Sequence, residues 1–323
     1  MDDNLIEVQN LKVYFRERQK TIVTLGPNYL KAVDDVSFTI KKGETFGLVG
    51  ESGSGKSTVG KGILRYHDLF GGKIFYENSE IGHLKEKELL PYRKKMQSIF
   101  QDPYSSLDPS KTISEIVREP MEIHNLYSVS ERKSRAADFI DMVGLKKEDL
   151  LKYPHEFSGG QRQRIAIARA LSIHPEFILC DEPISSLDVS LQVQIIQLLK
   201  KLQDKFFLTY LFISHQLQVV QKICDNIGVM YLGKILEISS SEDLFKNPLH
   251  PYTKMLMSSI LEPDPRIKSL DNIVFDSDEQ TRLINGCKFN RRCQHATEKC
   301  RETSPELQEM VPGHFVACFL YHE

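Results

Sequence analysis

The stretch Gly50-Glu51-Ser52-Gly53-Ser54-Gly55-Lys56-Ser57-Thr58 follows a short apolar strand pattern and opens a helical one. Its glycines let the backbone turn tightly and aim several N–H groups at one point, an arrangement that cradles phosphates. The helix N-terminus adds to this attraction, a lysine can reach the outer phosphates, and a serine hydroxyl can bind Mg²⁺. A flexible Gly/Ser linker is the alternative, but it gives no reason for Lys-Ser to follow the last glycine. We therefore predict a nucleoside triphosphate site, formed by Gly50, Ser52, Gly53, Ser54, Gly55, Lys56, Ser57 and Thr58.

Length and composition allow a large core with a second unit beside it, since 41% of the 323 residues are hydrophobic. The 42 basic and 44 acidic residues nearly cancel, so the total charge gives no sign of nucleic-acid binding. The apolar run 206–213 is far shorter than the ~18 residues that cross a bilayer. Residues 1–10 carry acids where a signal peptide carries bases. We expect a cytosolic or membrane-peripheral protein.

Apolar patterns predict an α/β core around the glycine loop. Strands are expected at 5–15, 32–40, 45–49, 73–76, 97–100, 177–182 and 208–213. Helices are expected at 58–65, 158–171 and 189–201, the last with Val193, Ile196, Leu199 and Leu202 facing inward. The polar residues 16–31 are interpreted as an inserted loop, and the charged residues 86–95 as a stretch that separates two strands.

A helical pattern replaces the strand pattern between residues 102 and 157. Its first apolar stripe contains Ile113, Ile116, Val117 and Met121, and a second stripe ends at Gly144. We interpret this segment as a small helical subdomain inserted into the α/β core.

Two carboxylates, Asp181 and Glu182, end a continuous apolar strand pattern of the buried parallel type. Open α/β sheets place their chemistry at the carboxyl ends of such strands. One acid can hold Mg²⁺ through water, and the next can orient or deprotonate an attacking water. An exposed pair of acids without a chemical role is the alternative. His215 also follows a strand pattern.

Taken together, these residues resemble the nucleotide-binding subunits of ATP-binding-cassette (ABC) transporters. The resemblance rests on the glycine loop, Gln101, the signature Phe157-Ser158-Gly159-Gly160-Gln161, the pair Asp181-Glu182, Ser186-Leu187-Asp188 and His215, in the family's order. The sequence departs from the family at Gln216, where many relatives have Asp, and at Ser186, where Ala is frequent.

The resemblance implies a role for each motif residue. Glu182 would be the catalytic base, His215 would contact the γ-phosphate, and Gln101 would sense the metal and the γ-phosphate. Mg²⁺ would be held by Ser57, Gln101 and Asp181. Phe15 would stack on adenine, with Tyr14 as a possible substitute. Further expected nucleotide-contacting residues are Ser158, Gly159, Gly160, Gln161 and Asp188.

In this family the signature of one subunit covers the ATP held by the glycine loop of another. A helix N-terminus at Ser158 would offer N–H groups to the γ-phosphate across that interface. Because the sequence has one glycine loop and one signature, the resemblance implies a second cassette on another chain.

Four of the six cysteines, Cys287, Cys293, Cys300 and Cys318, lie in the last 37 residues. This uneven distribution does not favour a disulfide framework. Together with the sequence Leu249-His250-Pro251-Tyr252-Thr253-Lys254, it resembles the tail of oligopeptide and dipeptide importers, which holds a [4Fe–4S] cluster. The resemblance implies that these four cysteines are the cluster ligands.

Other interpretations of the tail remain open. Zinc is the weaker metal, because the spacings are wider than those of Cys-x₂-Cys knuckles. Free thiols are the simplest alternative, since cysteine is also a common small core residue. His295 or His314 could enter as ligands. Cys180 and Cys224, in apolar contexts, are interpreted as packing residues.

By the resemblance, the chain is an ATP-hydrolysing subunit that powers import of oligopeptides or dipeptides at the cytoplasmic face of the membrane. The implied partners are a second, non-identical ATPase subunit, two transmembrane permease subunits gripped near residues 101–109, and indirectly an extracytoplasmic peptide-binding protein, with no nucleic acid. A nickel importer of the same family, a soluble non-transport ABC ATPase and a redox module are alternatives. The soluble ATPases usually carry two cassettes or a long coiled coil, and neither pattern is present.

The expected fold is α/β, a P-loop NTPase (RecA-like) core with a mixed or parallel sheet, an inserted helical subdomain and a small Cys-rich C-terminal extension. The expected domains are an ATPase core at 1–101 and 159–240, the helical subdomain at 102–158 and the extension at 241–323.

Overall fold

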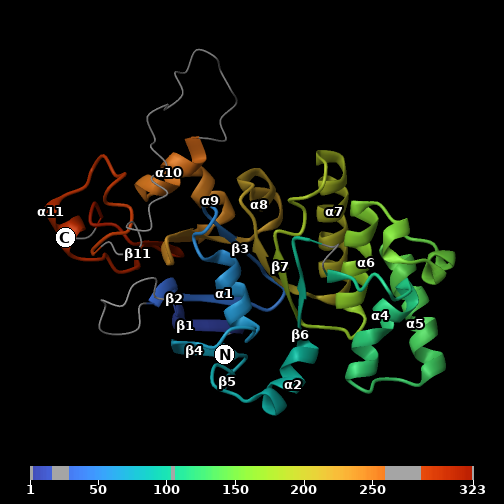
Figure 1. Ribbon diagram of the computed structural model, residues 1–323. Helices are drawn as coiled ribbons and strands as arrows, with labels where there is room; N and C mark the ends of the chain where they lie inside the picture. Colours follow the sequence, from blue (N-terminus) through green and yellow to red (C-terminus); the bar gives the residue numbers. More distant parts are fainter. Residues whose placement is uncertain (1–2, 17–28, 103–105, 259–284, 322–323) are drawn as a thin grey trace, which may run out of the picture. The chain divides into compact units, whose positions relative to one another are not determined.

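The computed structural model describes residues 3–16, 29–102, 106–258 and 285–321 (Figure 1). Residue contacts divide the chain into two compact units. The first contains Met1–Leu5, Ile40–Thr45 and His83–Ser214, and the second contains Ile6–Thr39, Phe46–Gly82 and His215–Glu323. Most of the inserted loop expected at 16–31 lies outside the described residues, and the expected domain boundaries stay a prediction.

The first unit is built on three parallel strands, β6 (Met96–Ile99), β7 (Phe177–Asp181) and β8 (Thr209–Ile213), with β7 in the middle. Every residue of β7 and β8 is buried. This is the environment that a continuous apolar run requires, because helices cover both faces of a parallel sheet. The three strands therefore bring their carboxyl ends to one edge of the sheet.

The inserted segment is helical, as expected. It contains α4 (Ile113–Ile123), α5 (Val129–Met142) and two 3₁₀ turns at Lys147–Leu151 and Pro154–Glu156. Helix α6 (Gly159–Leu171) packs against both α4 and α5, and the three lie side by side in Figure 1. The apolar stripe of α4 is buried. Capping boxes begin all three helices, at Thr112, Ser128 and Ser158.

Helix α7 (Val189–Phe206) runs five residues beyond its expected end and stops where Phe207 takes a left-handed conformation, φ 54°. Ile196, Leu199 and Leu202 are buried as expected, but Val193 is 47% exposed. The prediction for Val193 was wrong because Gln192 takes the inward position in that turn. Its amide donates hydrogen bonds to the carbonyls of Ile184 and Leu187, at 3.2 and 3.1 Å.

Helix α2 (Glu86–Lys95) occupies the charged stretch that was expected only to separate two strands. It has one buried residue, Leu89, and a proline, Pro91, inside it. Acidic residues in its first turn and basic residues in its last turn complement the helix dipole. The many charged residues gave this stretch no apolar periodicity, so no helix was predicted from the sequence. The same charges help to stabilise the helix.

The second unit contains two sheets. One has the order β2-β1-β4-β5, from β1 (Asn4–Arg16), β2 (Tyr29–Lys41), β4 (Gly71–Tyr76) and β5 (Ser79–Glu80). In the other, β3 (Thr45–Val49) pairs in parallel with β9 (Asn226–Tyr231), and β10 (Lys234–Ser240), β12 (His314–Val316) and β11 (Gln308–Val311) continue it in antiparallel fashion. A mixed α/β P-loop fold is therefore confirmed.

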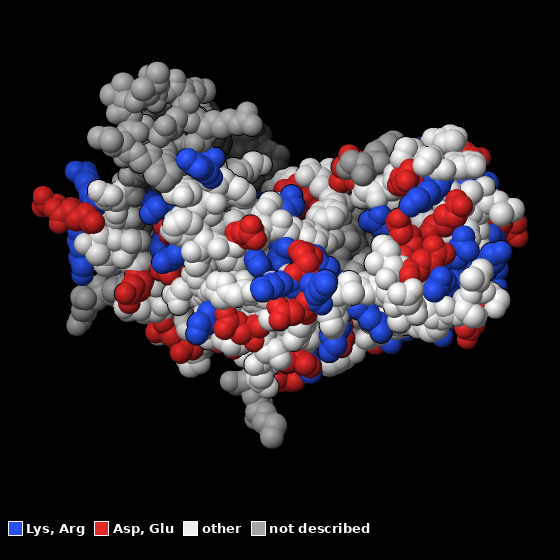
Figure 2. Space-filling view, turned by 60° about the horizontal axis from the view of Figure 1, so that its bottom comes forward, with Lys and Arg blue, Asp and Glu red and all other residues white. Residues whose placement is uncertain are grey.

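Helices of the second unit flank these strands. They are α1 (Lys56–Ile63), α8 (Leu217–Ile223), α9 (Ser241–Lys246), α10 (Pro251–Ser258) and α11 (Glu298–Glu302). No helix among the described residues is long and apolar enough to cross a membrane. On the face shown in Figure 2, basic and acidic side chains are interspersed, which agrees with the near-zero net charge.

Candidate nucleotide-binding site and a cysteine-lined cavity

The loop between β3 and α1 has the backbone shape that its glycines permit. Gly50 has φ 150° and Gly55 has φ 104°, values that side chains with a Cβ rarely adopt. A Cβ at Gly50 would lie 2.0 Å from the Met230 carbonyl oxygen, and one at Gly55 would lie 2.2 Å from that of Ala32. Both positions therefore require glycine for a close approach as well as for conformation.

Lys56, the first residue of α1, turns back over this loop. It is only 5% exposed, and its Nζ donates to the carbonyl oxygens of Gly50 and Glu51, at 2.8 and 2.9 Å. Gly55 is the N-cap, and the first turn of α1 carries no acidic side chain. The helix N-terminus thus presents positive charge and N–H groups, an arrangement suited to binding an anion.

Tyr14 and Phe15, the two aromatic candidates on β1, differ in what they contact. The Tyr14 hydroxyl donates to Asp34 Oδ1 at 2.5 Å, and its ring stacks on Phe70 with centroids 4.2 Å apart. Burial, together with the nearby carboxylate, raises the pKa of Tyr14. Phe15 is 36% exposed and meets His67 edge-on. Phe15 is therefore the aromatic residue with the more exposed ring.

The expected catalytic residues of the first unit lie at strand ends. Asp181 ends β7 and is buried, and Glu182 follows it at φ 50°, a left-handed conformation that is rare for a residue with a long side chain. The Glu182 N–H donates to the Ile213 carbonyl at 3.0 Å, which joins the ends of β7 and β8. Backbone strain of this kind clusters at functional sites.

Two other candidates follow neighbouring strands. Gln101 lies exposed after β6, and its carbonyl oxygen is 3.5 Å from the Ser186 hydroxyl. His215 is exposed two residues after β8 and is the first residue of the last segment of the second unit. Asp188 is the N-cap of α7, and its carboxylate accepts a hydrogen bond from the Leu191 N–H at 3.0 Å.

The signature residues form the start of α6. The Ser158 N–H donates to Gln161 Oε1 at 3.0 Å, and the Gln161 N–H lies 3.4 Å from Ser158 Oγ. A Cβ at Gly160 would lie 3.0 Å from Leu191 of α7, so this glycine lets the two helices approach closely. The side chains of Ser158 and Gln161 are exposed.

The expected residues thus form two groups. The second unit contains the glycine loop, Lys56 and the aromatic residues Tyr14 and Phe15, while the first unit holds Gln101, the Asp181-Glu182 pair and the signature. Residue types and spacing predicted both groups. Sequence reasoning missed two partners of the loop residue Glu51, Tyr252 and Arg292, because nothing in the motif points to residues so distant in the chain. It also missed Tyr231, whose hydroxyl lies 3.3 Å from Arg292 Nη1.

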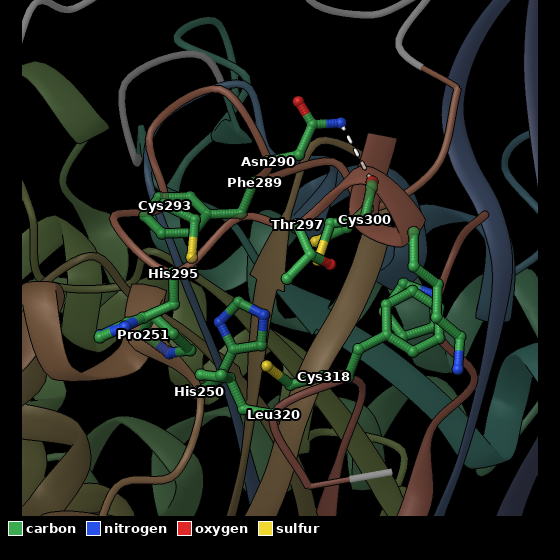
Figure 3. A pocket seen from close by; sticks show the side chains of 14 residues that line it. His250, Pro251, Phe289, Asn290, Cys293, His295, Thr297, Cys300, Cys318 and Leu320 are labelled. Carbon is green, nitrogen blue, oxygen red and sulfur yellow. Dashed lines mark hydrogen bonds between the residues drawn. The ribbon is translucent and has the colours of Figure 1, made fainter. Parts of the chain in front are cut away.

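The four C-terminal cysteines line one cavity of about 210 Å³, together with His250, Phe289 and His295 (Figure 3). Burial, with a smaller contribution from the other three thiols, raises the pKa of the Cys287 thiol to about 11. Among the described residues, which include all six cysteines, no three Cys, His, Asp or Glu side chains lie close enough to hold a single metal ion. Cys180 and Cys224 are buried elsewhere, as expected for packing residues.

His250 points into this cavity among the thiols (Figure 3). Its Nδ1 accepts a hydrogen bond from the Tyr252 N–H at 3.0 Å. Burial lowers the pKa of His250 to about 4, against the opposing charge of Glu237. The ring is therefore neutral with its proton on Nε2. This Nε2 is buried and has no hydrogen-bond partner, so the cavity contains an unused N–H donor.

A buried carboxylate binds the backbone at the cavity-lining residue His250. Glu237 of β10 is fully buried and accepts hydrogen bonds from the Leu249 and His250 N–H groups, at 2.7 and 2.9 Å. His314 Nε2 lies 2.7 Å from the same carboxylate. His314 is thus engaged by Glu237 and lies outside the set of cavity-lining residues.

Comparisons with known proteins agree with these features. Residues 33–185 match the family model described as "ABC transporter", and residues 236–300 match "Oligopeptide/dipeptide transporter, C-terminal region". A solved ATP-binding cassette, MJ0796 in a dimeric post-hydrolysis state bound to ADP and Pi, is 30% identical, with a TM-score of 0.64 over 73% of this chain and 98% of that one. CbiO1 from Clostridium perfringens, at 24% identity and a TM-score of 0.66 over 82% of this chain and 98% of that one, supports the fold.

The fold and the motifs define an ABC-type ATPase. Among curated relatives, the Bacillus subtilis proteins YkfD, a putative oligopeptide transport ATP-binding protein, and AppF, an oligopeptide transport ATP-binding protein, are 50% and 46% identical. These alignments cover 98% and 99% of this chain, and 95% and 98% of the relatives. This chain belongs to the family of ATP-binding subunits of oligopeptide ABC transporters, the ATPases that energise oligopeptide import.

Proposed function

We propose that this chain hydrolyses ATP at the glycine loop and couples the hydrolysis to uptake of oligopeptides or dipeptides through two membrane subunits. The observation that carries the proposal is the loop itself. Two glycines approach other backbone segments where a Cβ cannot fit, and a buried lysine stands at the N-terminus of the following helix. Such a loop is suited to the β- and γ-phosphates of a nucleotide.

The proposed chemistry divides among named side chains. Lys56 and the loop N–H groups hold the outer phosphates, Phe15 stacks on the adenine, and His215 contacts the γ-phosphate. Glu182 accepts a proton from the attacking water as general base. A reaction of this kind depends on positioning and on charge stabilisation, so the constrained backbone at Glu182 fits the role of aiming one carboxylate.

Mg²⁺ would be held by Ser57, Gln101 and Asp181. Hydroxyl, amide and carboxylate oxygens are the donors that Mg²⁺ takes, in a site shared with phosphate oxygens. When bound, the ion neutralises charge that develops on the phosphates. Of these residues, Asp181 is buried at the end of β7.

A second ATPase subunit, not identical to this one, would complete the site. The proposal is supported by the exposed side chains of Ser158 and Gln161 at the N-terminus of α6. A helix N-terminus attracts the γ-phosphate of a nucleotide held by the partner. The remaining signature residues, Gly159, Gly160 and Gln161, and the helix-capping Asp188 would lie at the same interface.

The complete assembly would contain two transmembrane permeases and receive peptide from an extracytoplasmic binding protein. This chain would lie on the cytoplasmic face of the membrane. Residues 101–109 would contact a permease, since they follow β6 beside the strand-end chemistry; residues 103–105 of this stretch are outside the described part of the chain.

We further propose that the cysteine-lined cavity holds a [4Fe–4S] cluster bound by Cys287, Cys293, Cys300 and Cys318. The ligands of one zinc ion share a centre about 2.3 Å from each sulfur, and the thiols are not grouped so closely. A cluster offers a separate iron to each thiolate and so suits more widely spaced ligands. The cavity volume and the unused N–H of His250, which can donate to a sulfur atom, support a bound group.

The test of the ATPase proposal is reconstitution. In the assembled transporter we expect ATP hydrolysis and peptide uptake, and we expect the isolated chain to be far slower because it lacks a partner's signature. A strictly monomeric chain that hydrolyses ATP at full rate, with Ser158 and Gly160 dispensable, would contradict the shared-site proposal.

A further inference from the structure

The segment between Cys287 and Cys293 contacts Glu51 of the glycine loop (residues 50–58, here also called the phosphate loop). This segment is a compact turn in which the Cys293 N–H donates to the Phe289 carbonyl at 3.0 Å, and the Asn290 N–H to that of Cys287, also at 3.0 Å. From the turn, Arg292 reaches Glu51 with Nη1 3.0 Å from Oε2. Both partners are largely shielded, with exposed side-chain fractions of 16% and 31%.

Glu51 is held at each of its polar groups. Its carboxylate meets Arg292, its carbonyl oxygen accepts from Lys56 Nζ at 2.9 Å, and its N–H donates to the Tyr252 hydroxyl at 3.0 Å. Tyr252 is fully buried, so that hydroxyl has a fixed position. Because Glu51 directly follows Gly50, fixing Glu51 fixes the entry of the phosphate loop.

Arg292 is itself positioned by an aromatic cluster. Its guanidinium lies 5.7 Å from the ring centres of both Tyr231 and Phe289, and Nη1 is 3.3 Å from the Tyr231 hydroxyl. The rings of Tyr231, Tyr252 and Phe289 contact one another, with centroids 4.7 to 5.6 Å apart. Phe289 also lines the cysteine cavity. A continuous set of packed side chains therefore runs from the cavity to the loop.

We propose that Arg292 is a positioning residue of the ATP site, through which the cysteine-bearing turn sets the conformation of the phosphate loop. Occupation of the cavity by the bound group then changes the affinity for ATP. ATP changes the affinity of the cavity for that group by the same factor, as linkage requires. The positioning step rests on the ATPase function, and the coupling to the cavity rests also on the proposed bound group.

The first experiment measures nucleotide affinity of the purified full chain with a fluorescent ATP analogue. Arg292→Met keeps the apolar stem and removes the charged fork, and we expect it to weaken binding roughly fivefold to tenfold. In the reconstituted transporter KM for ATP should rise by a similar factor with kcat nearly unchanged. Arg291→Met is the matched control, since Arg291 is exposed on the same turn, and it should leave affinity unchanged.

A double-mutant cycle isolates the contact. Glu51→Gln should weaken binding as Arg292→Met does, and the double variant should be no weaker than either single one, because both remove one interaction. Arg292→Lys should recover part of the affinity. Additive effects, or equal effects of Arg292→Met and Arg291→Met, would overturn the proposal. Thermal unfolding of each variant identifies any that have lost the fold. If Arg292→Met is one of them, the nucleotide affinity of Arg292→Lys tests the proposal instead.

The coupling is tested with Cys300→Ser, with iron content and visible absorbance measured on every preparation. We expect this change to lower ATP affinity in the wild-type background and to have no further effect beside Arg292→Met. An equal loss in both backgrounds, or no loss in either, would overturn the coupling. Iron-free wild-type protein would contradict the proposed cluster. It would not contradict the positioning role of Arg292, because the Arg292 and Glu51 variants are compared without any need for iron.

Discussion

At Gly50 and Gly55 the phosphate loop leaves no space for a side chain. The two hypothetical Cβ atoms would meet backbone carbonyl oxygens, which cannot move aside as a flexible side chain can. The loop therefore tolerates no substitution at these positions without a shift of the neighbouring strand or loop.

Gly55→Ala should lower the free energy of unfolding by about 1–3 kcal/mol, because the residue would be forced into a left-handed conformation against the Ala32 carbonyl. Denaturant unfolding measures this. Gly71→Ala is the control, since its Cβ would meet only the Lys12 side chain at 3.6 Å. Equal losses in the two variants would show that the loop has room to adjust.

Glu182→Gln should lower ATP turnover of the assembled transporter roughly 10²- to 10⁴-fold, since a general base contributes about that factor. ATP binding should persist because the amide keeps the size of the side chain. Phosphate release and nucleotide affinity are the two measurements. Glu176→Gln, a change at a partly exposed carboxylate paired with Lys95, should leave turnover unaltered, and undiminished turnover in Glu182→Gln would refute the base assignment.

Residue identity and spacing predicted the glycine loop, and the structure gives Gly50 and Gly55 the backbone shape expected of it. The roles of the individual motif residues stay a prediction. The contacts of Glu51 were beyond sequence reasoning. Its partners Tyr252 and Arg292 lie 201 and 241 positions away, and an acidic residue at that place in the loop is equally consistent with a solvated side chain.

Among the elements, α6 and α5 begin with the same kind of cap, so a comparison of the two can distinguish an effect on stability from an effect on ATP turnover. Ser158 and Ser128 cap α6 and α5 with the same capping box, and in both the side-chain oxygen lies 3.4 Å from the N–H three residues on. The two caps should therefore contribute similarly to folding.

Ser158→Ala and Ser128→Ala should each cost about 1 kcal/mol of stability. Only Ser158→Ala should also lower ATP turnover in the assembled transporter, because its helix N-terminus is proposed to face the partner's nucleotide. Chemical denaturation and phosphate release separate the two effects. Equal turnover in the two variants would limit Ser158 to a structural role.

Element types were predictable where the apolar period was strong, as in β7, α4 and α6. They were not predictable where other forces dominate. Helix α2 is stabilised by charge placement with a single buried residue, and Gln192 replaced Val193 inside because carbonyl groups beside it needed donors. The short strands β11 and β12 depend on pairing with β10, a tertiary contact that no local pattern signals.

For the whole molecule, the proposed cluster gives a direct prediction. The purified protein should be brown, absorb near about 400 nm and contain about four irons per chain. A colourless protein loaded with zinc would overturn it.

His250 extends this prediction. His250→Leu removes the N–H donor and should lower the reduction potential of the bound group, since hydrogen bonds to sulfur raise it. His250→Gln keeps an N–H donor at a similar reach and should retain a potential nearer the wild type. A redox titration followed by electron paramagnetic resonance measures both, and identical potentials would exclude the hydrogen bond.

The pairing of β3 with β9 has a consequence for biosynthesis. Strand β3 leaves the ribosome early, yet its parallel neighbour is made some 180 positions later (Phe46 pairs with Asn226), and β12 follows only after residue 313. Until then the nascent chain cannot close the sheet on which the nucleotide pocket depends, because such long-range pairing is slow and needs both strands. The glycine loop therefore cannot complete its packing before β9 has been made, because Gly50 closely approaches the Met230 carbonyl oxygen of that strand.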